Sequence, residues 1–343
     1  MSEENLVYIQ HDELRQLFKD KLMHAGMPEK YADKVAGLMI FADARGIHSH
    51  GAVRLQYYAE RTAKGGFNLE PQIEFEQTGP STAIYHADNT LGHYAAYHAM
   101  EEAIRMAEEN GIAAVGVKEM GHSGAIGYYV KMAAEKGLVA LSVCQSDPMV
   151  VPFGGSKPYF GTNPIAFGAP RENGAPIVFD MATTVQAWGK ILDARSKNHS
   201  IPDTWAVDDK GEPTTDPYKV SALLPVAGPK GYGLMMMVDI LSGSLLGLPF
   251  GQHVTSMYED YSQYRRLGQF HLVINPSYFG DEKQFLEQMN QMVNELHDIE
   301  PAQGFDQVYY PGEIQEDVVK KYEKSGIPIP ESIYDYMKSD KIY

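Results

Sequence analysis

The stretch that decides the fold runs from residue 112 to residue 136 and reads IAAVGVKEMGHSGAIGYYVKMAAEK. Its first six residues, 112–117, are apolar and rich in β-branched side chains, which predicts a buried strand. Residues 128–136 have the spacing of a helix, and the loop before them has glycines at positions 121, 124 and 127. A strand, a glycine loop and a helix in this order bring backbone N–H groups close to a ligand at the start of the helix.

The glycine loop contains His122 and is open to two functional interpretations. Its spacing, Gly-x-x-Gly-x-x-Gly, differs from the dinucleotide fingerprint Gly-x-Gly-x-x-Gly. The loop could cradle a phosphate, or it could present His122, whose ordinary pKa of about 6.5 suits general acid–base chemistry at neutral pH. A histidine with a purely structural role in the loop is the third interpretation, and the local pattern leaves all three open.

The segments around this stretch predict a mixed fold with helical ends. Residues 1–66 form a predicted helical unit, with helices over 11–27, 28–45 and 52–63. The centre alternates strands and helices, and helices return near the C-terminal end, which is typical of an α/β or α+β fold. The predicted strands cover 73–77, 82–86, 112–117, 138–144, 165–167, 177–179 and 270–274, and the predicted later helices cover 91–110, 128–136, 185–195, 232–248 and 282–298.

Composition narrows the class of protein. The net charge of −16 over 343 residues argues against nucleic-acid binding, which needs clustered Lys and Arg. Cys144 is the only cysteine, so no internal disulfide forms, and residues 1–5 lack the features of a secretory signal, which suits a cytoplasmic protein. The stretch 232–249 has the length of a membrane span but contains Asp239, glycines and serines. We therefore expect a buried core helix there, with Met235–Met237 in the core.

A second candidate site lies in residues 43–54, DARGIHSHGAVR. His48 and His50 could form a metal pair, but no cysteine or acidic ligand motif accompanies them. Alternatively, Ser49 and His50 supply donors at a helix start, and Arg54 follows four residues after His50 on the same helical face. Because a guanidinium group matches a carboxylate with two hydrogen bonds, this pattern also fits an anion site. A solvated helix end is the bland alternative.

Two further motifs each have an even weaker signal in isolation. Lys230 lies among glycines in GPKGYG (228–233), ahead of a helix, where it could bind phosphate or ribose or could simply occupy an exposed turn. Asp180 follows a predicted strand in FDMATT (179–184), where a carboxylate could hold ribose hydroxyls. The alternative for this segment is that Thr183 or Thr184 caps the next helix.

Together these segments resemble the malate/L-lactate/ureidoglycolate dehydrogenase family, which is distinct from the Rossmann-fold lactate and malate dehydrogenases. The resemblance covers nearly the whole chain and depends on several motifs in a fixed order. They are RGIHSHG (45–51) with Arg54, GHSG (121–124), GTNP (161–164), DMAT (180–183), GPKGYG (228–233) and PGE (311–313). The segments 144–155, 185–195 and 200–205 resemble the ureidoglycolate branch of that family.

The resemblance implies a non-Rossmann, malate/L-lactate dehydrogenase-like fold of α/β (α+β) class, with helical N- and C-terminal parts around a central mixed-sheet cofactor domain. It implies that residues 1–70 plus about 250–343 form a helical domain for dimerisation and the substrate side, and that 71–249 form the NAD-binding domain. It further implies a cytoplasmic homodimer with NAD as cofactor and a small-molecule substrate, and without a metal, nucleic acid or membrane partner.

The activity implied by the resemblance is NAD-dependent oxidation of (S)-ureidoglycolate to oxalurate, in the anaerobic use of allantoin as a nitrogen source. His122 matches the family's proton acceptor, and Gln145 and Asp147 are our candidates for contacting the ureido group. The alternatives are a dehydrogenase of another 2-hydroxy acid such as malate or lactate, an NAD-independent hydrolase or lyase, and a non-catalytic nucleotide-binding protein. The implied substrate-side residues are Ser49, His50 and Arg54, and the implied NAD contacts are Ser146, Asp180, Met181, Ala182, Lys230, Gly312, Glu313 and Ile314.

Overall fold

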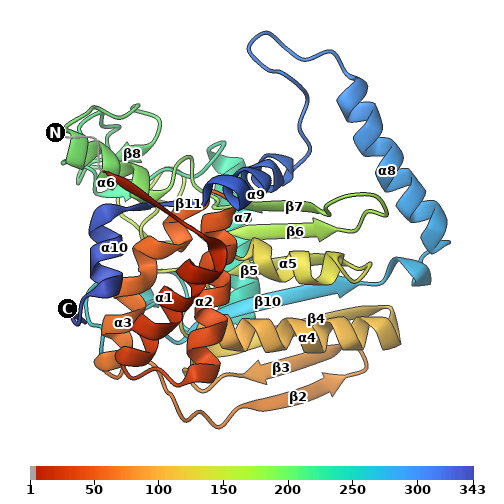
Figure 1. Cartoon of the computed structure of the whole chain (residues 1–343), viewed down its shortest axis with the longest axis horizontal. Helices are drawn as coiled ribbons and strands as arrows, with labels where there is room; N and C mark the ends of the chain where they lie inside the picture. The colour runs from red at the N-terminus through yellow and green to blue at the C-terminus, as the bar shows by residue number, and fades with distance from the viewer. Residues whose placement is uncertain (1–4) are drawn as a thin grey trace.

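The computed structural model describes residues 5–343, and its centre is a seven-stranded mixed sheet (Figure 1). The strand order is β2-β3-β4-β10-β5-β6-β7, in which β3 and β4 are parallel and all other neighbours are antiparallel. The strands are β2 (Glu74–Gly79), β3 (Thr82–His86), β4 (Ile112–Met120), β5 (Val139–Cys144), β6 (Ile165–Ala169), β7 (Ile177–Met181) and β10 (Leu267–Ile274). The predicted mixed class is confirmed.

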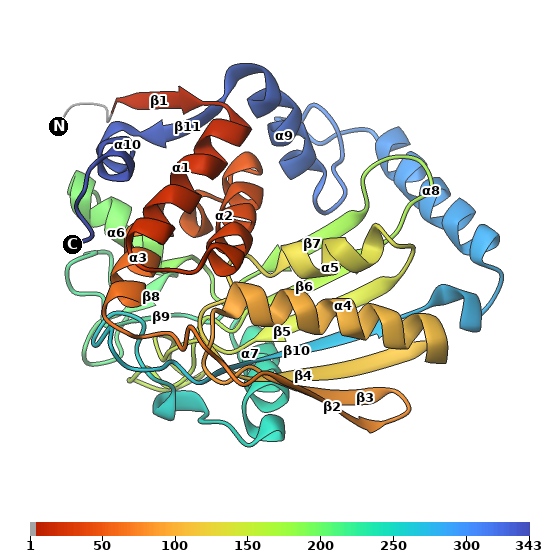
Figure 2. The same cartoon turned by 60° about the horizontal axis from the view of Figure 1, so that its bottom comes forward.

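Helices cover the two faces of the sheet unequally (Figure 2). The helices α4 (Gly92–Asn110) and α5 (Gly127–Ala134) lie on one face and bury alternate residues of the strands beneath them, such as Val115 and Val117. The helix α7 (Pro229–Ser242) packs on the other face against β5 and β10. This arrangement places the loop between β4 and α5 at one end of the sheet.

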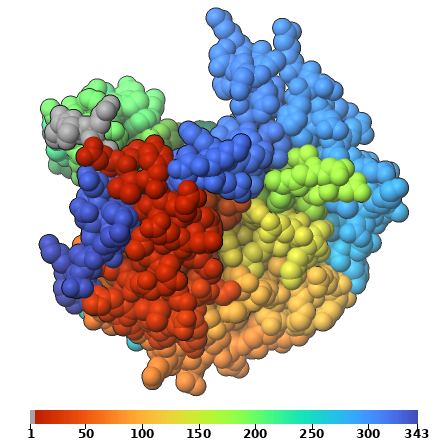
Figure 3. Space-filling view, viewed as in Figure 1, coloured from red at the N-terminus to blue at the C-terminus, as the bar shows by residue number. Residues whose placement is uncertain are grey.

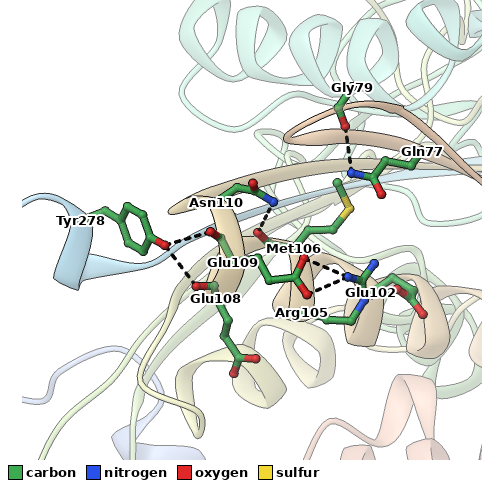
Figure 4. Close-up of polar contacts among 9 residues, drawn as sticks. All are labelled: Gln77, Gly79, Glu102, Arg105, Met106, Glu108, Glu109, Asn110 and Tyr278. Atoms are coloured by element: carbon green, nitrogen blue, oxygen red, sulfur yellow. Dashed lines mark hydrogen bonds and ion pairs between the residues drawn. The ribbon is translucent and has the colours of Figure 1, made fainter.

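The C-terminal end of α4 is fixed by polar contacts on its last turn (Figure 4). The Tyr278 hydroxyl donates to the backbone carbonyls of Glu109, at 2.9 Å, and Glu108, at 3.4 Å. These are carbonyl groups that a helix end leaves without an intrahelical partner. Gly111 then ends the helix in the left-handed conformation, with φ of 81°, as predicted from its sequence.

The N-terminal helices form a second core beside the sheet. The predicted helices are confirmed as α1 (His11–His24), α2 (Glu29–Ala44) and α3 (Leu55–Ala63). The sequence pattern missed β1 (Leu6–Ile9), which pairs antiparallel with β11 (Ile327–Pro330) from the far end of the chain. The C-terminal helices α9 (Glu313–Ser325) and α10 (Glu331–Lys338) therefore lie against the N-terminal unit.

Two expectations need correction. The strand β10 lies between β4 and β5, so the central sheet includes a segment beyond residue 249, and the proposed two-part division must assign 267–274 to the sheet. The helix α7 is not a buried core helix, because it ends at Ser242 and leaves Met236 and Met237 each 37% exposed; only Met235 of that trio is in the core. Among residues 5–343, no helix has the length and apolar character needed to cross a membrane.

Two smaller parts extend from this body. The helix α8 (Glu282–Asp298) and the loop after it form an arm that stands out from the surface (Figure 3). The helix α6 (Trp188–Lys197) and the short strands β8 (Ala206–Val207) and β9 (Ala222–Leu223) form a small lobe with its own buried cluster. The helix α9 lies between the N-terminal helices and the arm, and its first turn borders a pocket described below.

Candidate active site

The loop after β4 holds His122 in a packed environment. Gly121 donates its N–H to the Thr90 carbonyl at 2.9 Å, and the Tyr129 hydroxyl donates to the Ser123 carbonyl at 2.6 Å. Gly124 has φ of 76°, and a Cβ at this position would lie 2.9 Å from Nε2 of His93. The glycine at 124 is therefore required by backbone conformation and close packing, which explains the spacing without a phosphate.

The imidazole of His122 has two hydrogen-bond partners at Nδ1. The Tyr58 hydroxyl lies 2.7 Å from Nδ1, and the Gly124 N–H donates to the same atom at 3.3 Å. An amide can only donate, so this contact favours the tautomer in which Nε2 carries the proton and Tyr58 donates. When Nδ1 carries the proton instead, the Tyr58 hydroxyl accepts and Nε2 becomes a free base. Tyr58 can therefore support His122 as a proton donor and as a proton acceptor.

Burial and neighbouring groups keep His122 neutral. Burial lowers the pKa of His122 well below 6.5, and His50 and Arg54 lower it further. The His50 ring stacks on His122 with ring centroids 5.7 Å apart, and burial lowers the pKa of His50 to about 4. The fully buried His93 is the third histidine of this cluster, 6.2 Å from His122. Neutral imidazole is the form that accepts a proton from an alcohol.

The turn that contains His48 and His50 is built around Asp43 of α2. The Asp43 carboxylate is 1% exposed, accepts from the Ala52 N–H at 2.6 Å and lies 2.9 Å from Nδ1 of His48. A Cβ at Gly51 would lie 2.0 Å from this carboxyl group, so only glycine fits there. His48 is therefore bound to Asp43 while His50 stacks on His122. Within residues 5–343, no cluster of three or more potential ligands is arranged to hold a metal.

The predicted substrate-side residues lie next to His122. Two short 3-10 turns, His48–His50 and Ala52–Arg54, replace the single helix start expected from the sequence. Arg54 donates from Nε to the Ser49 carbonyl at 2.8 Å and from Nη1 to the Tyr258 hydroxyl at 2.9 Å. The Ser49 hydroxyl lies 2.9 Å from Nδ1 of His50. Ser49 thus orients both His50 and Arg54.

The sequence missed Arg265, which is 2% exposed and pairs with Asp147 at 3.0 Å. Its charge contributes to the low pKa of His122, which places it in the neighbourhood of the site. Within the described part of the chain, its Nε and Nη1 have no partner. Gln145 does not share the role proposed for it, because its amide donates to the Pro249 carbonyl and accepts from the Gly268 N–H. Gln145 therefore supports the fold.

Several predicted cofactor contacts converge on one pocket of about 400 Å³. Asp180, Gly312 and Ile314 line it, although more than a hundred residues separate Asp180 from the other two. Val178 and Phe179 add apolar wall, and a Cβ at Gly312 would lie 2.8 Å from the Val178 carbonyl. Apolar walls with one carboxylate fit an adenine ring and a ribose diol, so the residues present suit the adenosine part of NAD.

The remaining predicted cofactor contacts lie outside this pocket. The Ser146 hydroxyl accepts from the Thr162 N–H at 2.8 Å, and Thr162 in turn accepts at its carbonyl from the Thr183 hydroxyl at 3.0 Å. Neither Thr183 nor Thr184 caps the next helix, because α6 begins at Trp188 and its N-cap is Ala187. The part-buried Met181 and Ala182 connect Asp180 to Thr183, Lys230 is exposed at the start of α7, and Glu313 forms an ion pair with His297 at 2.8 Å.

The comparisons with known proteins agree with this geometry. The family model for malate/L-lactate dehydrogenase matches residues 9–338. The chain is 58% identical to Escherichia coli ureidoglycolate dehydrogenase (NAD(+)), over 98% of this chain and 96% of the relative. It is 39% identical to Pyrococcus abyssi malate dehydrogenase, over 97% and 94%. The structure of sulfolactate dehydrogenase from Methanocaldococcus jannaschii matches with a TM-score of 0.90 at 33% identity, covering 97% of this chain and 96% of that one. The chain belongs to the malate/L-lactate dehydrogenase family.

Proposed function

We propose that this chain oxidises (S)-ureidoglycolate to oxalurate with NAD, in the breakdown of allantoin. The observation that carries the proposal is His122, a neutral base held by Tyr58 and lying in the field of two guanidinium groups, those of Arg54 and Arg265. This arrangement suits a substrate with a carboxylate next to a carbon that carries a hydroxyl. The 58% identity to the Escherichia coli enzyme supports ureidoglycolate as that substrate.

The protein's part in the reaction is proton transfer and orientation. The C2 hydroxyl proton moves to Nε2 of His122 while the C2–H bond breaks and the C2–O double bond forms. The tautomer with a proton on Nδ1 leaves Nε2 free for this step, and the Tyr58 oxygen then accepts from Nδ1. When bound, NAD accepts the hydride that leaves C2. A placed base of this kind typically contributes about 10²–10⁴-fold to the rate.

Orientation of the substrate falls to the two arginines and Asp147. Arg54 binds the carboxylate, because its guanidinium group is already fixed by Ser49 and Tyr258. Arg265 supplies two further N–H donors, and the Asp147 carboxylate holds it in place. A site with these donors and acceptors discriminates against malate and lactate, because those substrates leave buried polar groups unpaired.

The experiment that tests the proposal is a comparison of NAD reduction rates with ureidoglycolate, malate and lactate, each with and without a chelator. We expect ureidoglycolate to be the best substrate and the chelator to have no effect. His122→Ala should reduce turnover by about 10²-fold or more with NAD binding retained, whereas the control His86→Ala, on the far strand β3, should not. Turnover of ureidoglycolate without NAD would favour a hydrolase or lyase and refute the proposal.

We also propose a cytoplasmic homodimer in which a second copy covers the outer face of α7. Leu234, Met237 and Ile240 are 39%, 37% and 50% exposed on this face, and Phe167 of β6, also on this side of the sheet, is 39% exposed. Met237→Glu should then shift the sedimentation coefficient from dimer to monomer. Leu192→Glu, at a residue 49% exposed on α6, is the matched control. A wild-type monomer at micromolar concentration would contradict the dimer.

A further inference from the structure

The pocket next to α5 has a helix N-terminus that the protein itself occupies. Gly127 is the first residue of α5, and its N–H donates to Oδ2 of Asp180 at 2.7 Å. A Cβ at Gly127 would lie 3.0 Å from this same oxygen, so the carboxylate sits directly against the backbone. Helix N-termini attract phosphate groups. Here a carboxylate from β7 already takes that position.

The other oxygen of Asp180 remains available to a ligand. The Asp180 side chain is exposed to the pocket, and within residues 5–343 its only hydrogen bond is the one to Gly127. Protein atoms crowd this side of the carboxyl group and raise its pKa to about 6, so it is mostly ionised at neutral pH. A fixed carboxylate with one free oxygen is a good acceptor for the hydroxyl groups of a ribose.

The cations in the wall of the pocket are both committed to carboxylates. Arg45 forms an ion pair with Glu316 at 3.0 Å and lies over the Phe41 ring. Lys131 forms an ion pair with Glu135 one helical turn further along α5. Binding of a 2′-phosphate usually requires an arginine or lysine that is free to contact it. In the described residues that line this pocket, neither cation is free.

We propose that Asp180 makes this chain select NAD over NADP. Its free oxygen accepts from the 2′-hydroxyl of the adenosine ribose, and its charge repels a 2′-phosphate at the same place. The capped N-terminus of α5 removes the backbone site that a phosphate would otherwise use. This inference depends on the proposed function, because it places the adenosine half of the cofactor in this pocket.

The test is a fluorescence titration of NADH and NADPH, without substrate, on the wild type and on Asp180→Asn. Asparagine keeps an oxygen for the Gly127 N–H and removes the charge, so the fold should be retained, which circular dichroism would check. We expect the ratio of NADPH to NADH dissociation constants to fall by on the order of 10- to 100-fold in Asp180→Asn. Glu172→Gln, at an exposed carboxylate in the β6–β7 turn outside the pocket, should leave the ratio unchanged.

The outcomes separate this inference from the proposed function. A wild type that binds neither nucleotide overturns the proposed function, and the inference with it. A wild type that binds NADH more tightly than NADPH, with the same ratio in Asp180→Asn, overturns the inference alone. Equal binding of both nucleotides by the wild type also overturns it. A second variant, Asp180→Ser, retains a small acceptor without charge and should change the ratio in the same direction as Asp180→Asn.

Discussion

Replacing Tyr58 with phenylalanine isolates the hydroxyl that contacts the proposed base. The Tyr58 ring is fully buried and packs edge-on against His93 at 4.8 Å, contacts that phenylalanine keeps. The hydroxyl lies 2.7 Å from Nδ1 of His122 and has no other hydrogen bond among residues 5–343. Tyr58→Phe therefore removes one hydrogen bond and leaves the shape of the core unchanged.

The size of the effect follows from the charge that His122 acquires. When Nε2 accepts the substrate proton, the imidazolium donates from Nδ1 to the Tyr58 oxygen, and a hydrogen bond to a charged group is worth about 1.5–3 kcal/mol. At about 1.36 kcal/mol for each tenfold change, kcat should fall roughly 10- to 100-fold. Since Tyr58 has no contact with the predicted cofactor pocket, KM for NAD should be unchanged.

Steady-state kinetics of ureidoglycolate oxidation across a pH series would measure this effect. Tyr57→Phe is the matched control, because Tyr57 is the neighbouring buried tyrosine and has no hydrogen bond to His122. Wild-type kcat and kcat/KM in Tyr58→Phe would refute the assignment of Tyr58 as the partner that positions His122. A rise in KM for NAD with kcat unchanged would refute it as well.

Three other perturbations follow from the site. Arg54→Lys should lower kcat/KM for ureidoglycolate about 10- to 100-fold despite the retained charge, because lysine cannot keep the contacts with Ser49 and Tyr258 and also bind a carboxylate with two bonds; unchanged kcat/KM would sink this idea. Asp147→Asn leaves Arg265 buried and unpaired, so denaturant titration should show a loss of about 3–5 kcal/mol in unfolding free energy, against less than about 1 kcal/mol for Asp193→Asn in an exposed pair. The pKa of His122 lies well below 6.5 because of burial, so its base form persists as pH falls, and kcat/KM for oxidation should stay flat from neutrality to 6.5; an acid limb centred at 6.5 would contradict the assigned environment.

The sequence was sufficient for local elements and insufficient for contacts between distant segments. The strand at 112–117 and the helices of 11–45 follow from local periodicity, and they form where expected. The position of β10 in the middle of the sheet depends on pairing with β4 and β5, which no local pattern reports. The exposed face of α7 illustrates the same limit, because composition indicates an apolar helix but does not say what covers it.

The candidate site shows the same division between local and distant signals. His122, Ser49, His50 and Arg54 came from motifs, and the structure places them together. Tyr58 carried a usable signal, since it lies four residues after Arg54 at helical spacing, but the sequence favoured a core role, and the ring is indeed buried. Arg265 gave no signal at all, because its partner Asp147 is 118 residues away along the chain.

The loop between β4 and α5 links the two halves of the proposed reaction. His122 lies near its start, where Tyr58 holds the imidazole, and Gly127 lies at its end, where Asp180 holds the backbone. Any shift of this loop would therefore move the base and the cofactor-side carboxylate together. Because proton and hydride transfer both depend on the placement of C2, a rigid loop that joins these groups keeps them in register. The glycine at 124, fixed by its positive φ and by contact with His93, gives the loop that rigidity.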